Sequence, residues 1–469
     1  MRFLSVILFV SAIFLFTFRL TSVPPGIETD EGSIAYNAAL ISKNLRDQNN
    51  RFMPTFILSS DHVDWKQPVL IYLLATMFKM LGITLLTFKL ANVLVALISL
   101  VLTYFLLREF FNAKLIAVGL AFFITTPMLI ISARIGTETI MPLLFCTAWL
   151  LSLVWYRKTS KALFLMLAAF SLGVGFYSFK GMRLIVPPYV FLTSIYVVYK
   201  KRFTDLFFFT ICLTPFFLIT PFLEQKYSGS IYDRKTIVFD SYQHQALYWF
   251  SNLSPSFLFV EGEIGKIFSV GLFGVFLLGT LPFFLAGIKA ATDKMSFFTF
   301  ILAIFICTPI LFGLAGSLGY GHRLLAMVPS FLIILVLGFK TLSKHKKTCI
   351  FLLILLAFNF LDFVKFYYFK YPTLNDTKSS FGNNLNDSFM ELAKLAKQNN
   401  KTPYVQNNIF GDKDDGNRFF EIAYFKGNLN KWVLGQPLPE NSILLTEVDT
   451  IQGMKKVSSP NDKLSILFN

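Results

Sequence analysis

Two adjacent carboxylates, Asp30 and Glu31, follow the first hydrophobic stretch of the chain, within the segment PPGIETDEGS. A carboxylate held beside a hydroxyl group can accept its proton, so this pair predicts general-base chemistry. A structural interpretation carries equal weight: Asp30 caps a helix that begins here, and Glu31 stabilises the positive first turn. The two interpretations are compatible.

A second polar cluster, DHVDWKQP, lies further along and holds Asp61, His62, Asp64, Trp65 and Lys66. His62 with its two aspartate neighbours is a candidate divalent-metal site, although short loop clusters of this kind are more often solvated polar groups. Lys66 precedes a proline-led hydrophobic segment, where an ammonium group is well placed to meet a lipid phosphate. Ordinary anchoring at the headgroup level explains Lys66 equally well.

Three later loops are short and carry cations. They are SARIGTE with Arg134, SFKGMR with Lys180 and Arg183, and GYGHR with His322 and Arg323. The predicted membrane topology places these loops on the outer side. Positive residues are usually found in cytoplasmic loops, so cations on the outer side need an explanation. An anionic ligand held among the outer helix ends would explain them. Tyr177, Tyr320 and Glu138 lie nearby in the sequence and could orient such a ligand, although isolated interfacial tyrosines are usually belt residues. The predicted substrate-orienting residues are Tyr72, Tyr177 and His62.

Carboxylates opposite several cations fit the transfer of a sugar from a lipid-linked phosphate to a hydroxyl group. Phosphate is already a good leaving group, so this reaction needs cations that neutralise the developing charge rather than a strong general acid. The acceptor hydroxyl needs a base that also holds it in line, which is the role predicted for Asp30. Because the outer compartment lacks nucleotide sugars, a membrane-embedded donor would place the site at the bilayer surface.

The elements that position these residues are membrane helices. Of the 469 residues, 55% are hydrophobic and 15% are charged, and apolar runs repeatedly reach the roughly 20 residues that a helix needs to cross a bilayer. The formal net charge of +16 does not indicate nucleic-acid binding, because the basic residues lie in short clusters between apolar segments. The four cysteines lie in apolar runs without metal spacing and predict neither a disulfide framework nor a zinc site.

Five basic clusters recur after every second apolar segment and predict the cytoplasmic loops. They define about eleven membrane helices, at residues 3–20, 87–107, 115–131, 138–156, 161–179, 183–199, 203–221, 264–288, 296–315, 323–341 and 349–366. An odd number of crossings from an inner N-terminus leaves the first loop, 21–86, and the tail, 367–469, on the outer side. Within that loop, apolar spacing after Glu31 predicts an amphipathic surface helix, and the short segment 68–82 predicts a helix at the outer interface.

The composition changes after Tyr371, where Asn, Asp, Lys and Gly become common. A helix-like stretch, SFMELAKLAKQ, is followed by the strand-like runs TPYVQ and NSILLTEV. This pattern predicts a small α/β domain of about 100 residues, a size that can hold a core of its own. The predicted domains are therefore a transmembrane domain, 1–366, and an extracytoplasmic C-terminal domain, 367–469.

With these features the chain resembles the GT-C glycosyltransferases, in particular the branch that uses polyprenyl-phosphate sugars and includes protein O-mannosyltransferases and the aminoarabinose transferases of lipid A. The likeness is carried in order, across residues 1–345, by PPGIETDEGSIAYNA, DWKQPVLIYLLATMFKMLG, ISARIGTET, YSFKGMRLIVPP and GHRLLAMVP. The Asp-Glu pair followed by the Lys-x-Pro segment is the most specific part. The absence of a β-trefoil insertion in the 222–263 loop favours a bacterial or archaeal cell-envelope enzyme.

The resemblance implies an all-α polytopic fold with an outward-facing active site and transfer with inversion. Asp30 matches the catalytic acid of the first loop, Glu31 is its usual neighbour, and Lys66 matches the lysine that approaches the donor phosphate. Arg183 or Arg323 share that task, with Arg134 a further candidate. The implied partners are a polyprenyl-phosphate sugar, membrane lipid, and a lipid, glycan or protein acceptor. The third outer loop lacks a second acidic motif, which leaves dependence on a divalent metal open.

A multi-pass transporter or flippase for a lipid or an anionic solute is the competing hypothesis. That class predicts charged or broken positions near the bilayer midplane and two related halves of the chain. Here the ionisable residues cluster at the loop ends, although Pro215, Gly274 and Pro309 interrupt helices. The sequence therefore favours the transferase.

Overall fold

The computed structural model describes residues 2–59, 64–231, 241–263, 265–293, 296–314, 320–382, 385–410, 414–451, 453–461 and 464–469. By packing, the chain forms two compact units. The first unit contains Met1–Phe18 and Asn92–Phe369, and the second contains Arg19–Ala91 and Lys370–Asn469. The loop that carries the acidic pair thus belongs to the same unit as the C-terminal segment. The domain boundaries at residues 366 and 367 stay a prediction.

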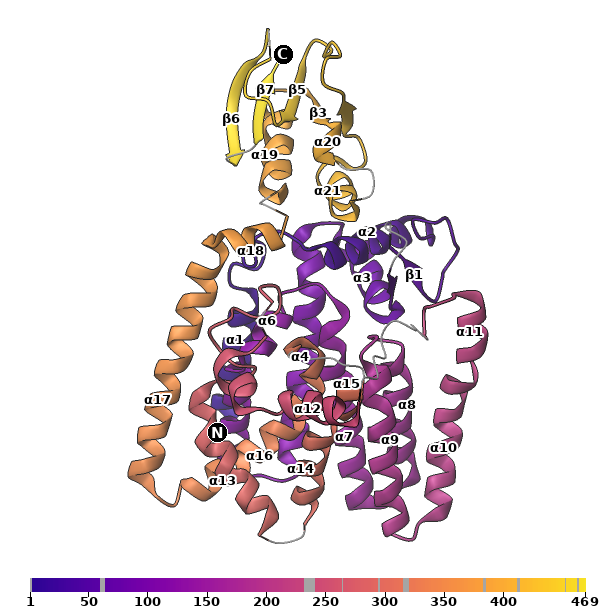
Figure 1. Ribbon diagram of the computed structural model, residues 1–469, viewed down its shortest axis with the longest axis vertical. Coiled ribbons are helices and arrows are strands. Elements are labelled where there is room, and N and C mark those ends of the chain that lie inside the picture. The colour runs from indigo at the N-terminus through magenta and orange to yellow at the C-terminus, as the bar shows by residue number, and fades with distance from the viewer. Residues whose placement is uncertain are drawn as a thin grey trace. The chain divides into compact units, whose positions relative to one another are not determined.

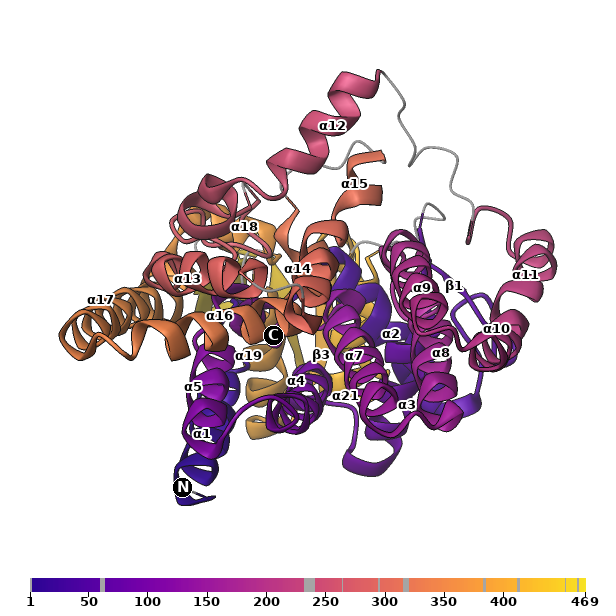
Figure 2. The same ribbon diagram turned by 90° about the horizontal axis from the view of Figure 1, so that it is seen from below.

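The first unit is helical. Its elements are α1 (Arg2–Thr17), most of α4 (Leu85–Arg108), α5 (Ala113–Ile124), α6 (Pro127–Ser132), η1 (Glu138–Ile140), α7 (Met141–Thr159), α8 (Ala162–Phe176), α9 (Met182–Tyr199), α10 (Phe203–Leu218), α11 (Thr220–Lys226), α12 (Tyr242–Ser251), η2 (Phe257–Glu261), η3 (Leu278–Thr280), α13 (Leu281–Thr292), α14 (Phe297–Cys307), α15 (Ile310–Leu314), η4 (Gly321–Met327), α16 (Val328–Leu342), α17 (Lys346–Lys365) and η5 (Phe366–Lys370). Helices α7, α8, α9 and α10 lie side by side (Figures 1 and 2).

The hydrophobic pattern located the long helices well. Among the described residues, six helical segments are long and apolar enough to cross a membrane: Leu85–Arg108, Glu138–Thr159, Met182–Tyr199, Phe203–Lys226, Gly321–Leu342 and Lys346–Thr373. Each contains one of the predicted spans. Four further predicted spans, near residues 3, 115, 161 and 296, overlap apolar helices of 10–17 residues. The span 115–131 is interrupted, because α5 ends at Ile124 and α6 begins at Pro127. The number of eleven crossings stays a prediction.

The predicted span 264–288 is wrong in its first half, because the described residues from 265 to 277 form no helix. Glycines explain this difference. Gly262 and Gly271 have positive φ angles of 67° and 70°, and a Cβ on Gly274 would lie 2.5 Å from the backbone of Leu258. The chain therefore runs as an irregular loop against η2, and the helix begins only at Leu278.

Close helix contacts in the first unit depend on two further glycines. A Cβ on Gly287 of α13 would lie 2.1 Å from the Ile334 carbonyl oxygen of α16. A Cβ on Gly338 of α16 would lie 1.8 Å from the Phe283 carbonyl oxygen of α13. The two helices therefore approach backbone to backbone, the contact that small residues allow between membrane helices.

The second unit begins with the first loop. This loop forms α2 (Thr29–Asn44), the short antiparallel strands β1 (Ile57–Leu58) and β2 (Trp65–Lys66), and α3 (Pro68–Leu81), and it continues into the first turns of α4. Fourteen residues make α3 about 21 Å long, which is shorter than the apolar core of a bilayer. This length agrees with the predicted position of α3 at the outer interface of the membrane. The position itself stays a prediction.

The C-terminal segment adds a five-stranded sheet with the order β4-β3-β5-β7-β6. Its elements are η6 (Tyr371–Thr373), α18 (Asn375–Ser380), α19 (Leu385–Gln398), β3 (Thr402–Gln406), α20 (Asn407–Phe410), α21 (Asp415–Phe425), β4 (Asn430–Trp432), β5 (Ser442–Thr446), β6 (Lys455–Asn461) and β7 (Leu464–Phe468). Strand β3 is parallel to β4 and β5, and the other pairings are antiparallel. Helix α19 packs along this sheet (Figure 1). The predicted α/β fold is confirmed, and the predicted helix and both predicted strands are found as α19, β3 and β5.

Candidate functional site

Helix α2 begins two residues earlier than a cap at Asp30 requires. Its N-cap is Glu28, which has an extended backbone with φ −90° and ψ 172°. The Glu28 backbone N–H donates a hydrogen bond of 3.0 Å to Oε2 of Glu31, which satisfies one of the free donors at the helix start. The N-cap interpretation of Asp30 is therefore wrong, and the capping role of the acidic pair belongs to Glu31. Asp30 lies within the first turn, where the helix dipole favours its charge.

A lysine on the neighbouring strand contacts Asp30. Pairing of β1 with β2 sets Ile57 opposite Lys66 and directs the Lys66 ammonium toward the start of α2. The Lys66 Nζ atom lies 2.7 Å from Oδ2 of Asp64 and forms an ion pair with Oδ1 of Asp30. The Lys66 side chain is only 2% exposed, whereas that of Asp30 is 57% exposed. The structure therefore combines a buried cation with a carboxylate that is open to an incoming molecule.

Glu31 has a different environment from its neighbour. Its Oε1 atom lies 2.5 Å from Nζ of Lys89, in the first turns of α4, and both side chains are fully buried. The two carboxylates that the sequence presents as one pair therefore divide their tasks, since Asp30 faces solvent and Glu31 forms an internal ion pair. Sequence reasoning missed Lys89, although a lone cation at the start of an apolar helix is a signal that a partner is needed.

A third carboxyl group, Glu28, completes the cluster. The residue is 9% exposed, and its Oε1 atom has no hydrogen-bond partner among the described residues. Burial, together with repulsion from Asp30 and Glu31, raises the pKa of Glu28 to about 8, and the nearby Lys66 only partly opposes this shift. Glu28 is therefore mainly neutral at pH 7 and leaves Asp30 as the exposed anion of the cluster.

We expect Glu28 to lower the free energy of unfolding as the pH rises. The unfolded chain ionises this group near its ordinary pKa of 4.5, whereas the folded chain holds the proton up to about 8. Within this window the folded state binds more protons than the unfolded state, so stability falls with rising pH. Glu28→Gln cannot ionise and should flatten this dependence, which thermal unfolding at several pH values from about 5 to about 8 measures. An unchanged slope in the variant would assign the dependence to another group.

Arg134, which the sequence predicts as a phosphate ligand, binds backbone carbonyl groups of the protein. It is fully buried in the first unit. Its guanidinium donates hydrogen bonds to the carbonyl oxygens of Phe16 and Phe18 at 2.8 Å, and it lies 4.8 Å from the ring of Tyr368. These contacts satisfy free carbonyl groups at the C-terminal end of α1. We therefore assign Arg134 a structural role and leave it out of the proposed site.

The remaining predicted ligands have mixed environments. Arg183 donates hydrogen bonds of 2.6 and 3.1 Å to the carbonyl oxygens of Ser230 and Ile231, and Arg323 lies 4.4 Å from the ring of Tyr320. The hydroxyl of Tyr177 donates to the Phe216 carbonyl at 2.6 Å, and that of Tyr72 donates to the Pro54 carbonyl at 2.8 Å. Both tyrosines thus tie chain segments together. The predicted roles of Arg183 and Arg323 at the donor phosphate stay predictions.

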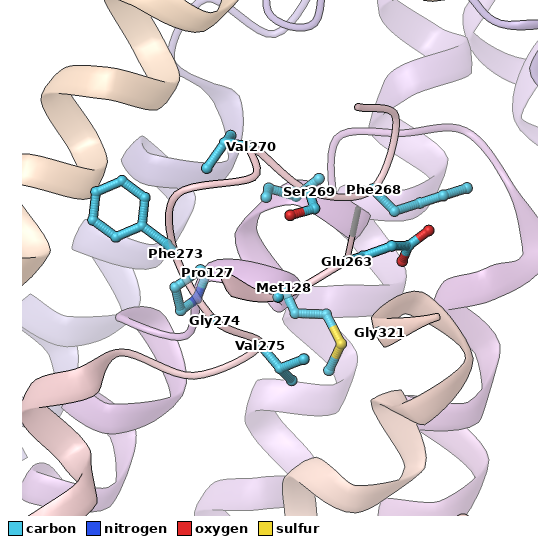
Figure 3. A pocket seen from close by; sticks show the side chains of 12 residues that line it. Pro127, Met128, Glu263, Phe268, Ser269, Val270, Phe273, Gly274, Val275 and Gly321 are labelled. Carbon is cyan, nitrogen blue, oxygen red and sulfur yellow. The ribbon is translucent and has the colours of Figure 1, made fainter. Parts of the chain in front are cut away.

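The metal hypothesis depends on residues that the structure does not describe, because His62 and Asp61 lie outside the described ranges. Within those ranges, no three His, Cys, Asp or Glu side chains gather as a metal site would need. His322, which the sequence predicts for an outer loop, pairs with Glu263, with Nδ1 2.9 Å from Oε2. Glu263 lines a small hollow between residues 268–275 and the start of α6 (Figure 3). Sequence reasoning did not single out Glu263.

Comparisons with known proteins point to one fold. No family model and no curated protein matches the chain. The crystal structures of ArnT from Cupriavidus metallidurans, in the apo state and bound to undecaprenyl phosphate, align with TM-scores of 0.57 and 0.56 at 12% identity, over 98% of this chain and 97% of that chain. The apo crystal structure of the Archaeoglobus fulgidus oligosaccharyltransferase aligns over 91% of this chain and 64% of that chain, with 12% identity and a TM-score of 0.48.

The alignment with ArnT extends over nearly the whole length of both chains. At this identity it establishes the fold and leaves the chemistry to be argued from the site. The chain has the GT-C fold that its sequence resembles, with a polytopic helical part and a small C-terminal α/β part.

Proposed function

We propose that this protein is an integral-membrane glycosyltransferase that moves a sugar from a polyprenyl-phosphate donor to a hydroxyl group of a cell-envelope lipid, glycan or protein. The observation that carries the proposal is the carboxylate of Asp30, which is exposed, stands in the first turn of a helix and lies beside the buried ammonium group of Lys66. The fold shared with ArnT, one structure of which contains undecaprenyl phosphate, supports a lipid-phosphate donor.

In the proposed reaction Asp30 acts as the general base. The carboxylate takes the proton of the acceptor hydroxyl while the acceptor oxygen attacks the anomeric carbon of the sugar. The bond between that carbon and the phosphate oxygen breaks on the opposite side, so the configuration inverts and polyprenyl phosphate leaves. A single displacement of this kind needs one base, which agrees with the division of tasks between Asp30 and Glu31.

Lys66 is the proposed cation for the departing phosphate. Its ammonium group already faces two carboxylates, Asp30 and Asp64, so these three side chains together carry a net charge of −1. A donor phosphate that binds Lys66 therefore has to replace one of these carboxylates. If the phosphate replaces Asp30 at Lys66, the Asp30 carboxylate is free to accept the proton of the acceptor hydroxyl when the donor binds. Lys66 would then neutralise the charge that develops on the leaving phosphate.

The proposed active site faces the extracytoplasmic side. The positions of the basic clusters support this orientation, since they assign the first loop to the side opposite the cytoplasmic loops. A polyprenyl chain dissolved in the bilayer presents its phosphate at the surface, where the acceptors of the cell envelope are also found.

A transfer assay tests the function. Purified protein in liposomes is supplied with a panel of polyprenyl-phosphate sugars carrying labelled sugar, together with membrane extract as the source of acceptors. We expect protein-dependent transfer from at least one donor, with release of polyprenyl phosphate in equal amount. Movement of labelled lipid across the bilayer without any transfer would support the transporter hypothesis instead.

A further inference from the structure

Helix α21 of the C-terminal segment packs directly on α2 (Figure 1). The contact is made at Gly32, which lies two residues after Asp30. A Cβ built on Gly32 would lie 2.7 Å from the backbone nitrogen of Gly416 and 2.8 Å from its Cα. Side chains do not tolerate such distances, so the absence of a side chain at Gly32 is what allows the two backbones to touch.

The same segment also holds the chain just before α2. Gly26 has a φ of 97°, and a Cβ on it would lie 2.3 Å from the Phe381 carbonyl oxygen. On the side of α21, a Cβ on Gly416 would lie 3.4 Å from Cδ1 of Ile27, which is ordinary contact. Residues on both sides of Asp30 therefore contact the C-terminal segment.

Side chains of α21 extend the contact to every helix of the first loop. The guanidinium carbon of Arg418 lies 5.7 Å from the ring of Tyr36, one turn further along α2. The buried ring of Phe419 lies 6.0 Å from that of Phe78 in α3 and 5.7 Å from that of Phe88 in α4. Phe88 is the neighbour of Lys89, the partner of Glu31. One helix thus joins α2, α3 and α4 around the acidic cluster.

We propose that the C-terminal segment is a positioning element of the active site: α21 sets the height and rotation of the first turns of α2, and therefore the distance from the Asp30 carboxylate to the reacting hydroxyl. This inference rests on the proposed function of Asp30. A general base must lie within hydrogen-bond distance of the proton it accepts, so a displacement of about 1 Å lowers the rate far more than it lowers donor binding.

Gly32→Ala is the direct test. The added methyl group has to separate the backbones of α2 and α21, and alanine favours helix formation more than glycine does, so weakened helix propensity would not explain a loss. We expect kcat to fall by about tenfold to 100-fold with little change in the KM for the donor.

The matched control is Gly416→Ala, because a Cβ there meets only side-chain atoms, at 3.1 Å or more. Its kcat should stay within about twofold of the wild type, since such neighbours can yield.

Hydrogen–deuterium exchange gives a second measurement that does not need activity. We expect amides of α2 around Gly32 to exchange faster in the Gly32→Ala variant than in the wild type or in Gly416→Ala. Phe419→Ala removes the ring between α3 and α4 without a steric clash and should give the same selective loss of kcat. Unchanged kcat and unchanged exchange in the Gly32→Ala variant would overturn the positioning role. Absence of transfer by the wild type would overturn the proposed function instead, while the exchange experiment would still report on the contact.

Discussion

Asp30→Asn should lower the rate of sugar transfer by about 10³-fold, within the 10² to 10⁴ that a general base contributes. Asparagine has the shape of aspartate, and its amide oxygen can still accept a hydrogen bond from Lys66. It cannot take the proton of the acceptor hydroxyl, so the loss should appear in kcat. The measurement is single-turnover transfer from the active donor, with wild type and variant compared at equal amounts of folded protein.

Asp64→Asn is the matched control for this experiment, because Asp64 contacts the same ammonium group at 2.7 Å. If Asp30 is the base, the Asp64 variant changes only the partners of Lys66 and should lose less than about tenfold. Equal losses in the two variants would mean that the charge balance at Lys66 matters and that the base lies elsewhere. Retention of most activity by the Asp30 variant would also exclude Asp30 as the base.

The sequence predicts the parts of this fold that depend on local patterns. Six long helices follow from apolar runs, and the α/β character of the tail follows from its strand and helix patterns. The error at 264–288 has a local cause as well, since Gly271 and Gly274 interrupt a segment that is otherwise as hydrophobic as a membrane helix. Mean hydropathy is an average over the segment and is little changed by single glycines, whereas a helix requires helical backbone angles at every residue.

The candidate site depends on contacts between distant residues, which local patterns do not contain. The sequence identifies Asp30 and Lys66 as candidates, and the structure brings them together across 36 positions. It does not indicate that Glu31 pairs with Lys89, 58 positions away, or that α21 lies against Gly32. Arg134 shows the opposite limit. Its residue type suggested a phosphate ligand, but in the fold it binds carbonyl groups at the C-terminal end of α1.

The ion pair between Glu31 and Lys89 leads to the largest expected effect on stability. Both side chains are fully buried, so each charge relies on the other for compensation. Glu31→Gln leaves the Lys89 ammonium group without a countercharge, and Lys89→Met does the same to the Glu31 carboxylate. Each single variant should lower the free energy of unfolding by about 3–5 kcal/mol, the usual cost of breaking a buried pair. Thermal or denaturant unfolding of the purified protein measures the loss.

The double variant, Glu31→Gln with Lys89→Met, separates the cost of an unpaired charge from the value of the pair. Removing both charges eliminates the uncompensated group, so the double variant should be more stable than either single variant. Asp449→Asn provides a surface control, because its ion pair with Lys456 is largely exposed and should contribute no measurable stability. If the losses of the single variants simply add in the double variant, the two charges do not compensate each other. The ion pair would then contribute nothing to stability through the link that it makes between α2 and α4.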